Sequence, residues 1–122
     1  MICVPKILYI QTSGLDSPER LYSPFILAQT ARAMSVEPAI FFLLKGVSVV
    51  KRGEAEKIKI GDFPILSDVL AKTVEMDIPL YACEQSSRLV GISPGDYVEG
   101  VKIVGAATLN DLALDADSVM TF

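Results

Sequence analysis

Short apolar segments alternate with helical patterns along this chain of 122 residues, and that alternation restricts its fold more than any other feature. Apolar residues spaced three and four apart predict helices over about 19–34 and 65–76, a short helix over 84–89, and a last helix capped by Thr108. Five further segments have the composition of strands: 6–12, 38–44, 78–83, 101–105 and 118–122. The pattern predicts one domain over 1–122, an α/β fold: a three-layer α/β/α sandwich with a five-stranded, mostly parallel sheet.

Each predicted helix has an apolar face that should pack on this sheet. Pro18 suits the first turn of the first helix, with Asp16 or Ser17 as its cap. The expected inward side chains are Leu21, Phe25 and Ala28 in the first helix, Leu66, Val69, Leu70 and Thr73 in the second, and Leu109, Leu112, Ala113 and Ala116 in the last. Segment 38–44 is apolar on both faces, which is typical of a central parallel strand.

The composition excludes several classes of site. The chain has no histidine, so it contains neither a Ser-His-Asp nor a Cys-His pair, and no imidazole can bind a metal. Its two cysteines stand apart and cannot build a closed zinc site. A net charge of −4 argues against nucleic acid as a partner. With no visible secretory signal and no apolar run long enough to span a bilayer, we expect a cytoplasmic protein without metal, organic cofactor or membrane contact.

Cys83 is the main candidate for chemistry because it ends a predicted strand and precedes a short helix. Free backbone N–H groups and the helix dipole at that position stabilise a thiolate. Ser86 and Ser87 could add hydroxyl donors for a thiolate or persulfide, and the charge of Lys45, on the same sheet edge, favours a nearby thiolate. We expect Cys83 to be partly accessible. The alternative is a small buried residue with a packing role.

Two other features at the ends of the predicted strands have weaker signals. Cys3 precedes the first strand, so it should lie roughly 20 Å from Cys83 at the opposite edge, where it packs as part of the terminal segment. The loop containing Ser13 and Gly14 joins a strand to a helix and could cradle a small anion. It has no glycine-rich phosphate motif, and Asp16 would repel a phosphate, so a plain turn is the simpler interpretation.

Four segments of the chain carry a resemblance to a known family. The segment 78–92 consists of an apolar strand ending in Cys83, a short helix, and the pair Gly91-Ile92. It resembles the cysteine segment of the DsrE/DsrF-like family. The opening strand 6–12 with its Ser/Asp loop, the aromatic segment 41–47 ending in Gly-Val, and the late strand 101–106 are also similar to that family, so the resemblance covers nearly the whole chain.

The resemblance implies a role in sulfur handling. Members of this family are small α/β/α proteins that accept sulfur as a persulfide on the strand-end cysteine, Cys83 here, and pass it to an acceptor such as a TusA-like carrier. They form homo-oligomers, typically trimers or hexamers, or heterohexamers of related subunits. The resemblance leaves open whether this chain is a sulfurtransferase with turnover or a stoichiometric carrier. The alternative is a non-catalytic binding or assembly subunit that holds a small anion or nucleotide at the carboxyl edge of the sheet.

The first predicted helix also indicates self-association. Its apolar residues cover more than one face, which a monomer of this size cannot bury. We therefore expect a homo-oligomer, a trimer or hexamer on the family resemblance, with Cys83 near a subunit boundary.

Overall fold

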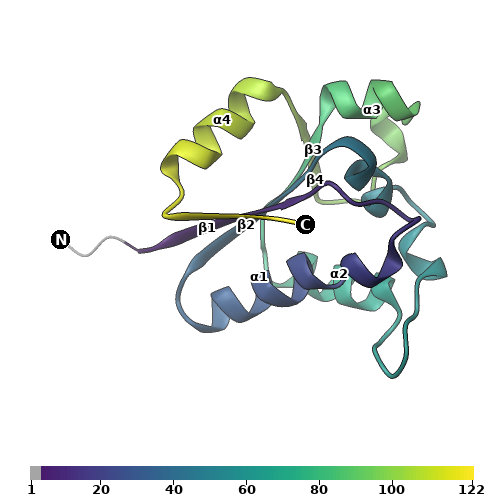
Figure 1. Cartoon of the computed structure of the whole chain (residues 1–122), viewed down its shortest axis with the longest axis horizontal. Coiled ribbons are helices and arrows are strands. Elements are labelled where there is room, and N and C mark those ends of the chain that lie inside the picture. Colours follow the sequence, from purple (N-terminus) through teal and green to yellow (C-terminus); the bar gives the residue numbers. More distant parts are fainter. Residues whose placement is uncertain (1–3) are drawn as a thin grey trace.

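The computed structural model describes residues 4–122, and within them the chain forms a five-stranded sheet (Figure 1). The strands are β1 (Lys6–Gln11), β2 (Glu37–Phe42), β3 (Leu80–Cys83), β4 (Val101–Val104) and β5 (Ser118–Thr121). Their order across the sheet is β4-β3-β2-β1-β5, and all four pairings are parallel. The predicted α/β class with a parallel sheet is confirmed.

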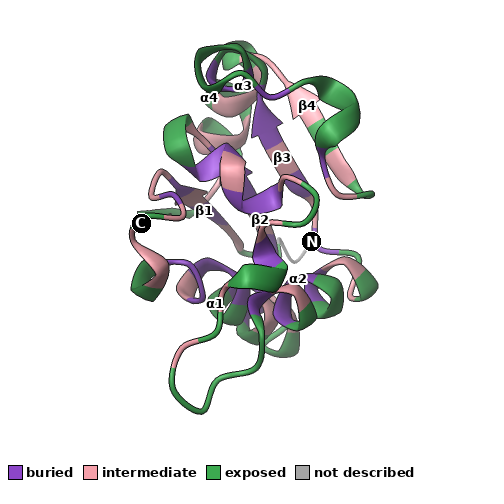
Figure 2. Ribbon diagram, turned by 90° about the vertical axis from the view of Figure 1, so that its right-hand side faces the viewer, coloured by how far each residue is buried: buried purple, intermediate pink, exposed green. Residues whose placement is uncertain are grey.

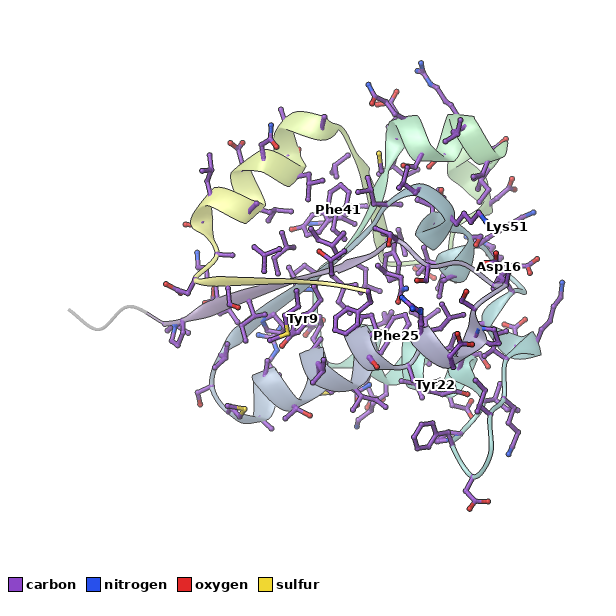
Figure 3. The ribbon with its side chains drawn as sticks, viewed as in Figure 1. Tyr9, Asp16, Tyr22, Phe25, Phe41 and Lys51 are labelled. Atoms are coloured by element: carbon purple, nitrogen blue, oxygen red, sulfur yellow. The ribbon has the colours of Figure 1, made fainter. Side chains whose placement is uncertain are left out.

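Helices cover both faces of this sheet. Helices α1 (Ser23–Ala33) and α2 (Leu66–Glu75) lie on one face, and α3 (Glu84–Val90) and α4 (Ala106–Asp115) lie on the other (Figure 1). Phe25 of α1 packs on Phe42 of β2 with ring centroids 5.8 Å apart, whereas Phe41 stacks on Tyr81 of β3 on the opposite face. Figure 3 shows Phe25 and Phe41 on the two sides of the sheet.

The core lies along the central strands. Ile40, Phe41 and Phe42 of β2 have no exposed surface, as expected for a strand buried on both faces. The side chains predicted to face inward on the first two helices are all buried, although Leu21 precedes α1. Those predicted on the last helix are partly buried against the same core. Figure 2 shows this burial running along the sheet, while the outer surfaces of the helices are exposed.

Two predicted helix starts are wrong. The segment Pro18–Arg20 is a separate 3₁₀ turn, and α1 begins only at Ser23. A continuous helix from residue 19 would place Pro24 in its interior, where proline cannot donate the hydrogen bond to Arg20 and its ring clashes with that turn. Ser17 precedes the 3₁₀ turn but makes no side-chain capping bond.

The last helix starts earlier than predicted. Helix α4 begins at Ala106 with Gly105 as its N-cap, so Thr108 lies within it. Ala106 and Ala107 both favour helix and extend it by two residues toward the N-terminus.

The connection after β2 is a 3₁₀ segment, η2 (Leu44–Val50), and it reaches the carboxyl edge of the sheet. Gly46 lies against the end of β1, where an added Cβ would stand 1.9 Å from the carbonyl oxygen of Gln11. Only glycine fits this approach, and it brings η2 beside the end of β3. Among the described residues, no helix is long and apolar enough to cross a membrane.

Candidate functional site

Cys83 is the last residue of β3 and the N-cap of α3, as the sequence predicted. Pairing with Val104 of β4 aligns it with the carboxyl edge of the sheet. Only 5% of the residue is exposed, so the expected partial accessibility is wrong for the single chain. The reason is that α3 packs closely on η2, and this contact closes over the junction. Cys3 lies outside the described residues, and its predicted position stays a prediction.

Ser86 contacts the sulfur through its backbone. Its N–H donates to Cys83 Sγ over 3.4 Å, while its side-chain Oγ accepts a hydrogen bond from the N–H of Leu44 over 2.8 Å. Leu44 has a φ of 56°, a left-handed conformation that costs a non-glycine residue about 1–2 kcal/mol. The start of η2 is thus held in a strained conformation while its backbone N–H points at α3.

Ser87 connects the junction to a residue that the sequence analysis did not identify. Its Oγ donates to the carbonyl oxygen of Cys83 over 2.8 Å and is hydrogen-bonded to the hydroxyl of Tyr97. In the described part of the chain, the hydroxyls of Ser86 and Ser87 therefore bind backbone groups and Tyr97, and no hydrogen bond joins either to the sulfur. Burial raises the pKa of Tyr97 above its ordinary 10.0; the bond to Ser87 partly offsets this, and charge at Cys83 adds to the rise.

A cleft opens beside α3, next to this network. It has a volume of about 240 Å³ and a mostly apolar lining. Ser87 belongs to its wall, and the residues that line it are Glu84, Ser87, Arg88, Ile92, Pro94 and Ile103. Glu84 and Arg88 form an exposed ion pair, 2.8 Å long, at α3. The cleft is a concave surface next to the Cys83 junction, of the kind at which another molecule can bind.

Lys45 lies in η2 but turns to a different loop. Its Nζ is 3.2 Å from Asp16 Oδ2, and both side chains are largely exposed. The structure thus brings Lys45 together with the 13–17 loop, because Gly14 packs against the Lys45 backbone so closely that a Cβ would come within 2.9 Å. The effect of Lys45 on the Cys83 sulfur stays a prediction.

The predicted anion loop uses its backbone donors internally. The N–H groups of Thr12 and Ser13 both donate to the carbonyl oxygen of Phe122, and the N–H of Ser17 donates to Gly14. Asp16 adds a negative charge at the loop. An anion would have to displace these bonds and meet that carboxylate, so the geometry favours the plain turn at Ser13 and Gly14.

Comparison with protein families agrees with the motif around Cys83. The model of the DsrE/DsrF-like family matches residues 5–122, almost the whole chain. The chain belongs to the DsrE/DsrF-like family.

Relatives of this DsrE/DsrF-like protein include one with a named role. The sulfur carrier protein DsrE2 of Allochromatium vinosum is 25% identical over an alignment of 152 positions, gaps included, which covers 92% of this chain and 94% of that protein. An uncharacterized protein of Methanocaldococcus jannaschii is 31% identical over 105 residues, covering 86% of this chain. The match spans only 38% of the length of that second relative.

A solved structure has the same fold. The ychN protein of E. coli superposes with a TM-score of 0.82 at 24% identity, over 98% of this chain and all of that one. The two chains thus share one fold over nearly their whole length.

Proposed function

We propose that this DsrE/DsrF-like protein is a sulfur-relay protein that accepts sulfane sulfur on Cys83 and passes it to an acceptor thiol. The observation that supports this most is the β3–α3 junction, where the Cys83 sulfur already accepts a hydrogen bond from the N–H of Ser86. The relative from Allochromatium vinosum is a sulfur carrier by name, which points to the same chemistry.

Loading is a displacement at sulfur. With thiosulfate as donor, the Cys83 thiolate attacks the sulfane sulfur, an S–S bond forms, and sulfite leaves with the electron pair of the bond that breaks. The products are sulfite and a persulfide anion on Cys83. Charge and electrons balance without an outside oxidant, and the step uses neither a histidine nor a metal.

Unloading repeats the same exchange in the other direction. An acceptor thiolate attacks the terminal sulfur of the persulfide, and Cys83 leaves as a thiolate. On family grounds we propose a TusA-like carrier as the acceptor. A sulfurtransferase would repeat this cycle catalytically. A stoichiometric carrier would deliver one sulfur atom per protein molecule.

The junction suits a charged sulfur. A hydrogen bond from an N–H group to an anion is roughly twice as strong as one to a neutral acceptor, so the Ser86 N–H favours the thiolate and the persulfide over neutral forms. The Ser86 N–H therefore stabilises the reactive form of the sulfur. The adjacent cleft has a mostly apolar lining.

Mass spectrometry of the intact protein tests the proposal. After incubation with thiosulfate, tetrathionate or polysulfide, we expect an adduct that maps to Cys83 and disappears with a thiol reductant. Cys83→Ser should abolish it, because the hydroxyl is not a nucleophile toward sulfane sulfur. Cys3→Ser is the matched control, since it also replaces one thiol by a hydroxyl, and it should load as the unmodified chain does.

The same experiment distinguishes the sulfur-relay function from the alternative function. A non-catalytic binding or assembly subunit would take up no sulfur from any of the three donors. Absence of an adduct on a folded, fully reduced protein would therefore contradict the sulfur-relay proposal. Equal loss of loading in Cys83→Ser and Cys3→Ser would show that the two thiols act together.

A further inference from the structure

The hydrogen-bond directions between α3 and Tyr97 can be assigned by counting hydrogens. Ser87 has one hydroxyl hydrogen, and its Oγ lies 2.8 Å from the carbonyl oxygen of Cys83, which can only accept. Ser87 therefore donates to Cys83 and must accept from Tyr97. The result is a directed chain: the Tyr97 hydroxyl donates to Ser87, and Ser87 donates to the backbone of the residue that carries the sulfur.

All three residues of this hydrogen-bonded chain are buried. Tyr97, Ser87 and Cys83 are each no more than 5% exposed. Burial raises the pKa of Tyr97, so its phenol keeps the hydrogen that the chain needs. A buried hydroxyl network with every hydrogen assigned holds its members in one arrangement, because a lost partner leaves a buried polar group unsatisfied.

Tyr97 itself is fixed by the segment that follows η2. Its carbonyl oxygen accepts a hydrogen bond from Arg52 Nε over 2.7 Å, and its backbone bridges to Lys51. The beginning of η2 contacts α3 as well, through the bond from Leu44 to Ser86. Both serines of α3 are thus tied, one directly and one through Tyr97, to the two ends of the same segment.

We propose that Tyr97 is a positioning residue for the chemistry of Cys83: through Ser87, its hydroxyl fixes the first turn of α3 so that the Ser86 N–H stays directed at the sulfur. This inference rests on the proposed function, because it assigns Tyr97 a part in sulfur loading. Tyr97 does not touch the donor. It acts by keeping one backbone donor in place while the sulfur becomes an anion and then a persulfide.

Tyr97→Phe removes only the hydroxyl and is the decisive variant. The rate of adduct formation on Cys83 with thiosulfate, followed by mass spectrometry in a single loading, should fall roughly three- to tenfold. Tyr9→Phe is the matched control, because Tyr9 is also buried and its hydroxyl also makes one hydrogen bond, to the carbonyl oxygen of Leu27 in α1. It should load at the unmodified rate. Equal rates in the two variants would overturn the proposal.

Ser87→Ala separates positioning from simple stabilisation. If Tyr97 acts through Ser87, the double variant Tyr97→Phe/Ser87→Ala should load no more slowly than Ser87→Ala alone. Independent effects that multiply would contradict the proposal. Ser87→Ala also keeps the proposal testable if Tyr97→Phe fails to fold, because a loading rate unchanged by Ser87→Ala would overturn it without the tyrosine variant.

A spectroscopic measurement makes the test independent of sulfur transfer. In ¹H–¹⁵N spectra, Tyr97→Phe should shift the Ser86 amide signal, which reports the N–H bond to the sulfur, and Tyr9→Phe should leave it in place. A folded protein that takes no sulfur would defeat the proposed function, and the Ser86 signal would still decide the role of Tyr97. An unmoved Ser86 signal combined with earlier thermal unfolding of Tyr97→Phe would make the hydroxyl purely structural and overturn the inference.

Discussion

The two faces of the sheet are held by different forces. On one face, α1 and α2 pack on the strands through residues that are almost all apolar: Pro24, Phe25, Ala28, Ala31, Leu66, Val69, Leu70 and Thr73. On the other face, the buried residues of α3 are two serines, and α4 contributes no buried residue within the described chain. One face is joined by continuous apolar packing, the other by a small polar network and a partly covered helix.

This difference assigns the two faces different tasks. Apolar packing is not directional, and it supplies most of the free energy of folding. Hydrogen bonds contribute less on average but fix direction, which a reacting sulfur requires. The candidate site lies on the polar face, so variants there should change reactivity more than stability, and variants on the α1 face should do the reverse.

Truncation of one apolar side chain on each face should give the largest effect and tests the comparison directly. Phe25→Ala should lower the free energy of unfolding by about 3–5 kcal/mol, because the ring is fully buried against Phe42 and leaves a cavity. Leu112→Ala on α4 should cost less than about 2 kcal/mol, since this side chain is only partly buried. Urea unfolding measures both. Equal costs would mean that the α4 face is as tightly packed as the α1 face.

The α1 face is also the part of the fold that the sequence predicted well. Its inward residues recur with helical periodicity, so a local pattern was enough to identify Phe25, Ala28, Leu66 and Val69 as core. The helix starts were missed where a second local rule competed with the pattern, as Pro24 does in α1. Periodicity identifies faces reliably because every turn of a helix repeats the signal.

The candidate site was predictable only in part. Cys83 and its neighbours Ser86 and Ser87 were found because a strand end followed by a helix is a local signal. Tyr97 was not, because its backbone is placed by a bridge to Lys51, far away in the sequence, and no local pattern shows that its hydroxyl then reaches Ser87. The sequence predicted backbone N–H donors at the sulfur, and the N–H of Ser86 is one. It did not predict that the Ser86 hydroxyl binds Leu44 in place of the sulfur.

The second prediction concerns the outer side of the α1 face. Leu27 and Met120 are 37% and 40% exposed. Met120 pairs with Tyr9 across β5 and β1, and the Tyr9 hydroxyl binds the Leu27 carbonyl, so these two exposed apolar residues, the β5-edge strip, both lie close to Tyr9. We propose that this strip joins subunits of a homo-oligomer, because edge strands with apolar side chains favour association.

Sedimentation equilibrium tests this assembly. Leu27→Lys/Met120→Lys should weaken association at least about tenfold, since two buried apolar contacts are replaced by charges. Leu114→Lys is the control, because Leu114 is an equally apolar residue, 86% exposed on α4, and it should leave the mass unchanged. A monomeric unmodified protein would contradict the proposal. Dissociation by Leu114→Lys alone would move the interface to the α4 face.

The smallest expected effect is on the pH dependence of stability, and it is tested by comparing one buried tyrosine from each face. Burial raises the pKa of both Tyr9, on the α1 face, and Tyr97, beside α3, above 10.0. As the pH rises past that value, unfolded phenols lose protons that the folded ones still hold, so the free energy of unfolding falls with pH by at most about 1.4 kcal/mol per unit for each group. Tyr9→Phe and Tyr97→Phe should each flatten this fall, measured by urea unfolding from about pH 8 to about pH 11. Lys6, whose pKa is raised by its bond to Asp115, contributes equally to all variants and cancels.

Only one of the two tyrosines should respond to the cysteine. Charge at Cys83 adds to the raised pKa of Tyr97, whereas burial is the cause for Tyr9. In a Cys83→Ser background, Tyr97→Phe should therefore flatten the fall in stability less than it does in the unmodified chain, and Tyr9→Phe should act as before. If Cys83→Ser altered the effects of Tyr97→Phe and Tyr9→Phe on the pH dependence of stability equally, the electrostatic link between Tyr97 and the sulfur would be contradicted. The distinction between a face that packs and a face that reacts would fail with it.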